Sequence, residues 1–183
     1  MTQQPAAGRS RYSLGSSSNL VRSLLVILGL VAVLVAIVPR VTSVPRPSVD
    51  AAGVARDAAR STGLALLVPQ GLPSGWTPTT AQLQPTTDQI LTWQTGWTTP
   101  DDGFVLLRQA ADVSPGWISA ATTGGTVVGS EQLAGRTWEK RYDATHDQTS
   151  LVDQQPALTT VVTAKGDPGN LTAFVDALKP AAG

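Results

Sequence analysis

The chain has no cysteine and a single histidine among its 183 residues. Without cysteine, no disulfide bond can stabilise the fold, and no thiol is present to accept a lipoprotein anchor. With one imidazole and no thiolate, the chain also lacks the three or four good ligands that a zinc site usually takes. We therefore expect neither a bound metal nor a cofactor.

Recognisable catalytic patterns are also missing. The sequence contains no G-x-S-x-G nucleophile elbow, no P-loop and no H-E-x-x-H zinc motif. Asp101 and Asp102 are adjacent in a turn, where their carboxylates point apart and are poorly placed for general acid–base work. Asp143, His146 and Asp147 fit a polar hairpin loop, although a metal site or a hydrolase that uses His146 as its base stays an alternative. We expect a protein that is not an enzyme.

Charged residues make up only 14% of the chain, and they are distributed unevenly. Residues 1–60 contain seven arginines and two aspartates, a formal charge of +5, whereas residues 61–183 contain six basic and eleven acidic side chains, a formal charge of −5. A basic flank suits anionic lipid headgroups. An acidic domain without a basic stripe argues against binding to nucleic acid.

Only one long apolar run is present. Residues 20–38 consist of Leu, Val, Ile, Ala and Gly apart from Arg22 and Ser23. As a helix rising ~1.5 Å per residue they would extend roughly 28 Å, close to the ~30 Å hydrocarbon core of a bilayer. Pro39 would then end the helix. The sequence therefore predicts an uncleaved, single-pass transmembrane helix over 20–38.

Two other interpretations of this run fit its flanks less well. A cleaved signal peptide needs small residues after the apolar run, whereas residues 36–40 read Ala-Ile-Val-Pro-Arg. A buried helix of a soluble protein is usually shorter. The N-terminal flank carries Arg9, Arg11 and Arg22 and no acidic residue, which predicts a cytoplasmic N-terminus and an extracytoplasmic C-terminal domain.

Composition divides the chain into four predicted parts. Residues 1–19, rich in Gln, Ser, Gly and Arg, predict a disordered cytoplasmic tail ahead of the transmembrane helix at 20–38. Residues 39–63 indicate a Pro/Ala-rich linker and a stalk helix that Gly63 can terminate. Residues 64–183 are long enough for one extracytoplasmic domain with its own core.

This domain reads as strands interrupted by short helices. Pro115 follows Ser114 at the start of one helix, and Asp167 can cap another that begins at Pro168 and stops at Pro180. Apolar alternation and turn residues predict strands over 64–68, 90–98, 104–110, 126–133, 136–142, 148–154 and 159–164. This order is typical of an α+β domain with an antiparallel sheet and covering helices.

All five tryptophans lie in the same domain. Because the chain has only two Phe and two Tyr, the tryptophans either fill the core beneath the sheet or form a surface on which a ligand or partner stacks. The candidate ligand or partner surface consists of Trp76, Trp93, Trp97, Trp117 and Trp138.

Several short segments occur in an order that is typical of one family. They are Leu72 to Trp76, Trp93 to Pro100, Trp117, Leu133 to Trp138 and Thr160 to Thr163, and they follow an Arg-flanked apolar run with a Pro-rich exit. Over roughly residues 20–180 the chain resembles an actinobacterial family of single-pass, membrane-anchored proteins, domain of unknown function 4245. The resemblance implies an anchored extracytoplasmic domain and supplies no catalytic residues.

Together these features favour one function and leave two others open. We expect a membrane-anchored, non-enzymatic interaction or sensing domain at the cell envelope, whose partners are the lipid bilayer and an envelope protein or lipid, and not nucleic acid. The alternative is a carrier of a small molecule or lipid, with tryptophans lining a cavity between sheet and helix. A hydrolase built around His146 is the third hypothesis.

Overall fold

The computed structural model describes residues 16–37 and 49–181, and the chain divides into two compact units, Met1–Pro45 and Arg46–Gly183. The first unit contains helix α1, Ser16–Ile37, which begins in polar sequence ahead of the start predicted at residue 20. Of the predicted tail and linker, residues 1–15 and 38–48 lie outside the described residues.

No helix within residues 16–37 or 49–181 combines the length and the apolar character that crossing a membrane requires. The structure therefore gives no support to the transmembrane helix predicted over 20–38. The remainder of the fold prediction, an α+β domain with an antiparallel sheet and covering helices, is confirmed.

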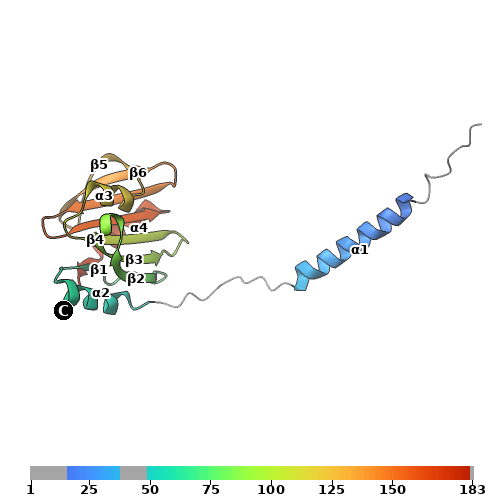
Figure 1. Ribbon diagram of the computed structural model, residues 1–183, viewed down its shortest axis with the longest axis horizontal. Helices are drawn as coiled ribbons and strands as arrows, with labels where there is room; N and C mark the ends of the chain where they lie inside the picture. Colours follow the sequence, from blue (N-terminus) through green and yellow to red (C-terminus); the bar gives the residue numbers. More distant parts are fainter. Residues whose placement is uncertain (1–15, 38–48, 182–183) are drawn as a thin grey trace, which may run out of the picture. The chain divides into compact units, whose positions relative to one another are not determined.

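The second unit is built on a seven-stranded antiparallel sheet. Its strands are β2 (Thr77–Pro85), β3 (Leu91–Thr98), β4 (Phe104–Ala110), β5 (Thr126–Leu133), β6 (Arg136–Asp143), β7 (Gln148–Gln154) and β8 (Thr159–Lys165). They lie in the order β2-β3-β4-β8-β7-β6-β5, so two runs of hairpin-connected strands meet where β4 pairs with β8 (Figure 1).

Two strands, β2 and β9 (Leu178–Pro180), were not predicted, and the strand predicted over 64–68 lies later, as β1 (Leu67–Pro69). β2 was not expected, because it is polar and carries proline near both ends; it is tolerated because β2 is an edge strand. Helix α4 (Pro168–Asp176) ends early, and β9 follows it and pairs with β1. The helix predicted to continue to Pro180 is therefore wrong at its end, because this pairing satisfies backbone groups of β1 that have no other partner strand.

A helix covers each face of the sheet. Successive residues of a strand point to opposite faces: in β8, Val162 packs in a core with α4, and Val161 packs in a core with α3 (Pro115–Ala121). Helix α2 (Ala51–Thr62) contributes to a third cluster, with β1 and β3. The α3 helix lies against β8 and the short helix η1 (Thr87–Gln89), whereas most side chains of β5 stay exposed.

Candidate functional site

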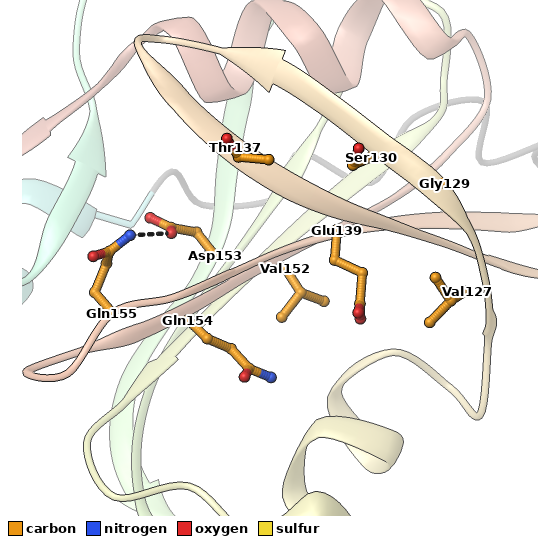
Figure 2. Close-up of a pocket in the computed structure, with 9 residues that line it drawn as sticks. All are labelled: Val127, Gly129, Ser130, Thr137, Glu139, Val152, Asp153, Gln154 and Gln155. Atoms are coloured by element: carbon orange, nitrogen blue, oxygen red, sulfur yellow. Dashed lines mark hydrogen bonds between the residues drawn. The ribbon is translucent and has the colours of Figure 1, made fainter.

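An open groove of about 530 Å³ lies across β5, β6 and β7 (Figure 2). Its lining comprises Val127, Gly129, Ser130, Thr137, Glu139, Val152, Asp153, Gln154 and Gln155. Glu139 and Val152 are directly paired across β6 and β7, so their side chains share one face of the sheet. Because Val152 belongs to the core beneath α3, the groove lies on the α3 side of the sheet.

The alternation of β6 explains why polar side chains line this groove. Thr137 and Glu139 are two residues apart and point to the groove, whereas Trp138 between them points to the opposite face. There Trp138 is buried in the core beneath α4. One strand thus anchors a core on one face and presents polar groups on the other.

Arginines pair with both carboxylates near the groove, but only the Glu139 carboxylate points into it, because Asp153 follows Val152 in β7 and so points to the opposite face. Nε of Arg141 lies 2.6 Å from Oε1 of Glu139, and Nη1 of Arg136 lies 2.9 Å from Oδ2 of Asp153, whose side chain is only 2% exposed. The other Asp153 oxygen accepts a 2.7 Å hydrogen bond from Nε2 of Gln155 (Figure 2). Because Arg141 offsets the charge of Glu139, the groove presents a polar but nearly neutral surface, which suits hydrogen bonding better than the recognition of a charged ligand.

The edge of the sheet runs beside the groove. Within residues 16–37 and 49–181, β6 is the one strand that pairs with β5, and a bulge between Val127 and Gly129 interrupts this pairing. Val127 and Val128 are 55% and 56% exposed. An edge strand presents backbone N–H and C=O groups that another extended chain can pair with. Groove and edge together can therefore hold an extended polar segment that has small apolar anchors.

The turn between β6 and β7 holds the only histidine. Nδ1 of His146 is hydrogen-bonded to Oδ2 of Asp143, and the Thr145 backbone N–H donates to Oδ1 of the same carboxylate at 2.9 Å. The hydrogen bond with His146 is the main cause that lowers the pKa of Asp143. The Tyr142 hydroxyl donates to Asp147, and this bond raises the pKa of Tyr142.

This turn shows little of the arrangement that catalysis or metal binding needs. Over the described ranges, no three acidic or histidine side chains are grouped so that they could hold a metal ion. In the same ranges the only side-chain hydrogen bond of His146 is the one with Asp143, so no serine or threonine hydroxyl is bonded to it as an activated nucleophile would be. The turn is a hydrogen-bonded element that closes the hairpin.

The five tryptophans occupy two kinds of environment. Three are at most 1% exposed and belong to the three cores: Trp93, Trp117 and Trp138. Trp76 and Trp97 are half-buried and pack against Phe174 of α4, with ring centroids 5.7 and 6.0 Å away. None of the five lines the groove on β5, β6 and β7, so the structure does not bring them together as one surface there.

Sequence reasoning did not single out the groove residues. Each is an ordinary polar residue of a strand, and only the register of β6 with β7 brings Glu139 opposite Val152. The one available signal was the alternation of Thr137, Trp138 and Glu139, which marks a strand with one buried and one polar face.

Comparison with known proteins gives one match. Residues 13–178 match a family described as a protein of unknown function (DUF4245), a range that includes every helix and strand from α1 to α4. No curated protein and no solved structure matches the chain.

Proposed function

We propose that this chain, which belongs to the DUF4245 family of proteins of unknown function, is a membrane-attached domain at the cell envelope that binds a partner and carries out no chemistry of its own. The proposal has two parts. The first concerns α1 and the membrane, and the second concerns the groove on β5, β6 and β7. Each is supported by a different observation.

Support for membrane attachment comes from α1. Its large apolar side chains between Leu20 and Leu34 are 48% to 68% exposed. Exposure of so many apolar side chains to water is costly, which favours their coverage by lipid or protein. In the full form of the proposal α1 is a single-pass anchor, the Arg-rich N-terminal flank is cytoplasmic, and the second unit is extracytoplasmic.

The single observation that carries the binding role is the polar groove beside the exposed β5 edge. Its Glu139 carboxylate is already paired with Arg141, so a partner gains hydrogen bonds without having to supply charge. The partner that fits is an extended, polar segment of another envelope protein, which can add to the edge as a strand. The acidic character of residues 61–183 speaks against nucleic acid as the partner.

Two alternatives have less support. A carrier with a tryptophan-lined cavity requires several tryptophans around one cavity, yet the groove has none in its lining, and two other cavities have one each, Trp117 and Trp97. A hydrolase that uses His146 requires a nucleophile beside it, and within the described residues that ring is bonded to Asp143.

A matched pair of variants tests the binding role. Glu139 and Glu131 lie on opposite faces of the β5–β6 hairpin, and each makes an ion pair on its own face, with Arg141 and Lys140 respectively. The full-length protein, cross-linked in envelope membranes and recovered in mild detergent, should bring down a reproducible protein partner. We expect Glu139→Lys to weaken that recovery roughly tenfold, the effect of losing one important interface contact.

The control variant is Glu131→Lys, which changes the same charge on the face away from the groove and should leave recovery unchanged. Recovery of no partner by the wild-type protein would count against the binding role. Equal losses in both variants would assign binding to the fold as a whole rather than to the groove.

A further inference from the structure

A second, smaller cavity lies on the same sheet face, at β3 and β4 rather than at β5 to β7. It has a volume of about 120 Å³, and its polar lining is formed by Thr86, Thr87, Gln94 and Arg108, with Trp117 and Ala121 of α3 as further walls. Gln94 and Arg108 are directly paired across β3 and β4. Every charged side chain in this lining is therefore basic, since Arg108 is the only one.

Arg108 is mostly buried, and it makes no ion pair with another residue that the structure describes. Its Nη1 donates a 2.8 Å hydrogen bond to the Ala121 carbonyl, which also accepts from Oγ1 of Thr163 at 3.2 Å. None of the salt bridges between described residues includes Arg108. Burial alone lowers the pKa of its guanidinium, which nevertheless stays charged. A buried charge without a counter-charge is unfavourable, so this site gains from an anion.

The acidic side chain of η1, Asp88, does not pair with Arg108, because none of the ion pairs between described residues joins the two. Asp88 of η1 accepts a hydrogen bond from Ser114, the residue that caps the start of α3. Its carboxylate also lies against Gly116 in the first turn of that helix. Arg108 instead contacts Ala121, the last residue of α3. Asp88 therefore contacts the start of α3, whereas Arg108 contacts its end.

The other polar groups of the cavity form a fixed wall. Nε1 of Trp117 donates a 2.8 Å hydrogen bond to Oγ1 of Thr92, which lies 2.7 Å from Oγ1 of Thr86. Among the described residues no side-chain hydrogen bond involves the Thr87 hydroxyl or the Gln94 amide. Both are therefore available to a ligand, together with the guanidinium donors that Ala121 does not use.

We propose that this cavity binds a phosphate group, with the Arg108 guanidinium as the main contact and Thr87 and Gln94 as additional donors. The arginine fork matches two oxygens of a phosphate, and donors from η1 and β3 can reach the remaining oxygens. The small volume admits the phosphate itself and requires any larger molecule attached to it to extend outward. This proposal is independent of the binding role of the groove on β5, β6 and β7.

Nuclear magnetic resonance of the full-length protein in detergent tests the site. The indole N–H of Trp117 reports on the cavity, because Trp117 is part of its wall. Titration with inorganic phosphate, at an ionic strength held constant with chloride, should shift this resonance in a saturable way. A parallel titration with glycerol phosphate distinguishes free phosphate from a phosphate monoester, and acetate serves as the carboxylate comparison. We expect both phosphates to bind and acetate to bind much more weakly.

Two arginine variants connect the shift to the proposed contact. Arg108→Gln should weaken phosphate binding roughly tenfold or more, because it removes a charge-assisted pair. Arg60→Gln should not weaken it, because Arg60 lies on the exposed surface of α2 in a pair with Asp57. Thr87→Val leaves Arg108 in place and should weaken phosphate binding by a smaller factor. This variant tests the site if the Arg108→Gln protein does not fold. The proposal is overturned if the shift does not saturate, if acetate binds as well as phosphate, or if neither Arg108→Gln nor Thr87→Val weakens binding.

Discussion

Asp143 ends β6 with a carboxylate that is almost buried and yet favours its charged form. His146 and the Thr145 backbone N–H both donate to it, and these hydrogen bonds lower its pKa below the ordinary value of 3.8. A carboxylate whose pKa is lower in the folded than in the unfolded protein stabilises the fold above its unfolded pKa. That stabilisation is lost as the pH falls below 3.8 and through the lower pKa of the folded state.

Replacement of this carboxylate should change how stability depends on pH. We expect Asp143→Asn to lose less stability than the wild-type protein on acidification, because an amide does not titrate. Denaturant midpoints measured between about pH 6 and about pH 3 provide the comparison. His146→Gln, which changes the main hydrogen-bond partner, should show an intermediate slope. Three parallel curves would contradict this account of Asp143.

At the scale of secondary-structure elements, the end of α2 depends on one glycine. Gly63 has φ +73°, and its backbone N–H donates to the Ala59 carbonyl at 2.8 Å. This left-handed conformation is unfavourable for residues with a Cβ. No atom lies within 4 Å of the place where a Cβ would be added at Gly63, so a side chain there meets a conformational cost and no steric clash.

Two substitutions separate these effects. Gly63→Ala should lower the free energy of unfolding by roughly 1–2 kcal/mol, because alanine must adopt the left-handed conformation. Gly63→Asn should cost less, because asparagine tolerates that conformation better. Urea denaturation of both variants measures the difference. A larger loss for Asn than for Ala would show that the side chain, and not the backbone, determines the effect.

The elements that the sequence predicted well are those with local signals. The start of α4 follows from Asp167, whose carboxylate accepts a 3.0 Å hydrogen bond from the Gly169 N–H, and α3 begins at the Ser114 cap in the same way. β9 had no such signal: Leu178 continued the helical spacing of α4, and only its pairing with β1, more than a hundred residues earlier, makes it a strand.

The candidate site could not be predicted from the local sequence, again because it depends on pairing between distant segments of the chain. The groove depends on which strand lies beside β6 and in which register, and both are set by long-range pairing. A one-residue shift of β7 would place Leu151 instead of Val152 opposite Glu139. Most of the tryptophans, which the sequence suggested as a binding surface, lie in the cores, where large apolar side chains contribute most to stability.

At the scale of the whole molecule, charge and apolar surface are separated along the chain. The basic residues 1–60 include α1 with its exposed apolar side chains, and the acidic residues 61–183 include the entire seven-stranded sheet. This separation is the pattern expected of a protein whose N-terminal part faces the cytoplasmic leaflet and whose folded domain is on the other side. The proposed localisation therefore predicts that residues ahead of α1 are accessible from the cytoplasm and that the second unit is accessible from outside the cell.

This prediction can be tested directly, because the natural chain has no cysteine and a single introduced cysteine is then its only thiol. Ser10→Cys places it ahead of α1, and Asp57→Cys places it on α2, where the native side chain is 74% exposed in a surface pair that contributes little to stability. In intact cells, a membrane-impermeant maleimide should label Asp57→Cys and should label Ser10→Cys only after permeabilisation. The reverse pattern would contradict the orientation. Protection of both thiols until lysis would end the proposal of an extracytoplasmic domain, because residue 57 would then never have left the cytoplasm.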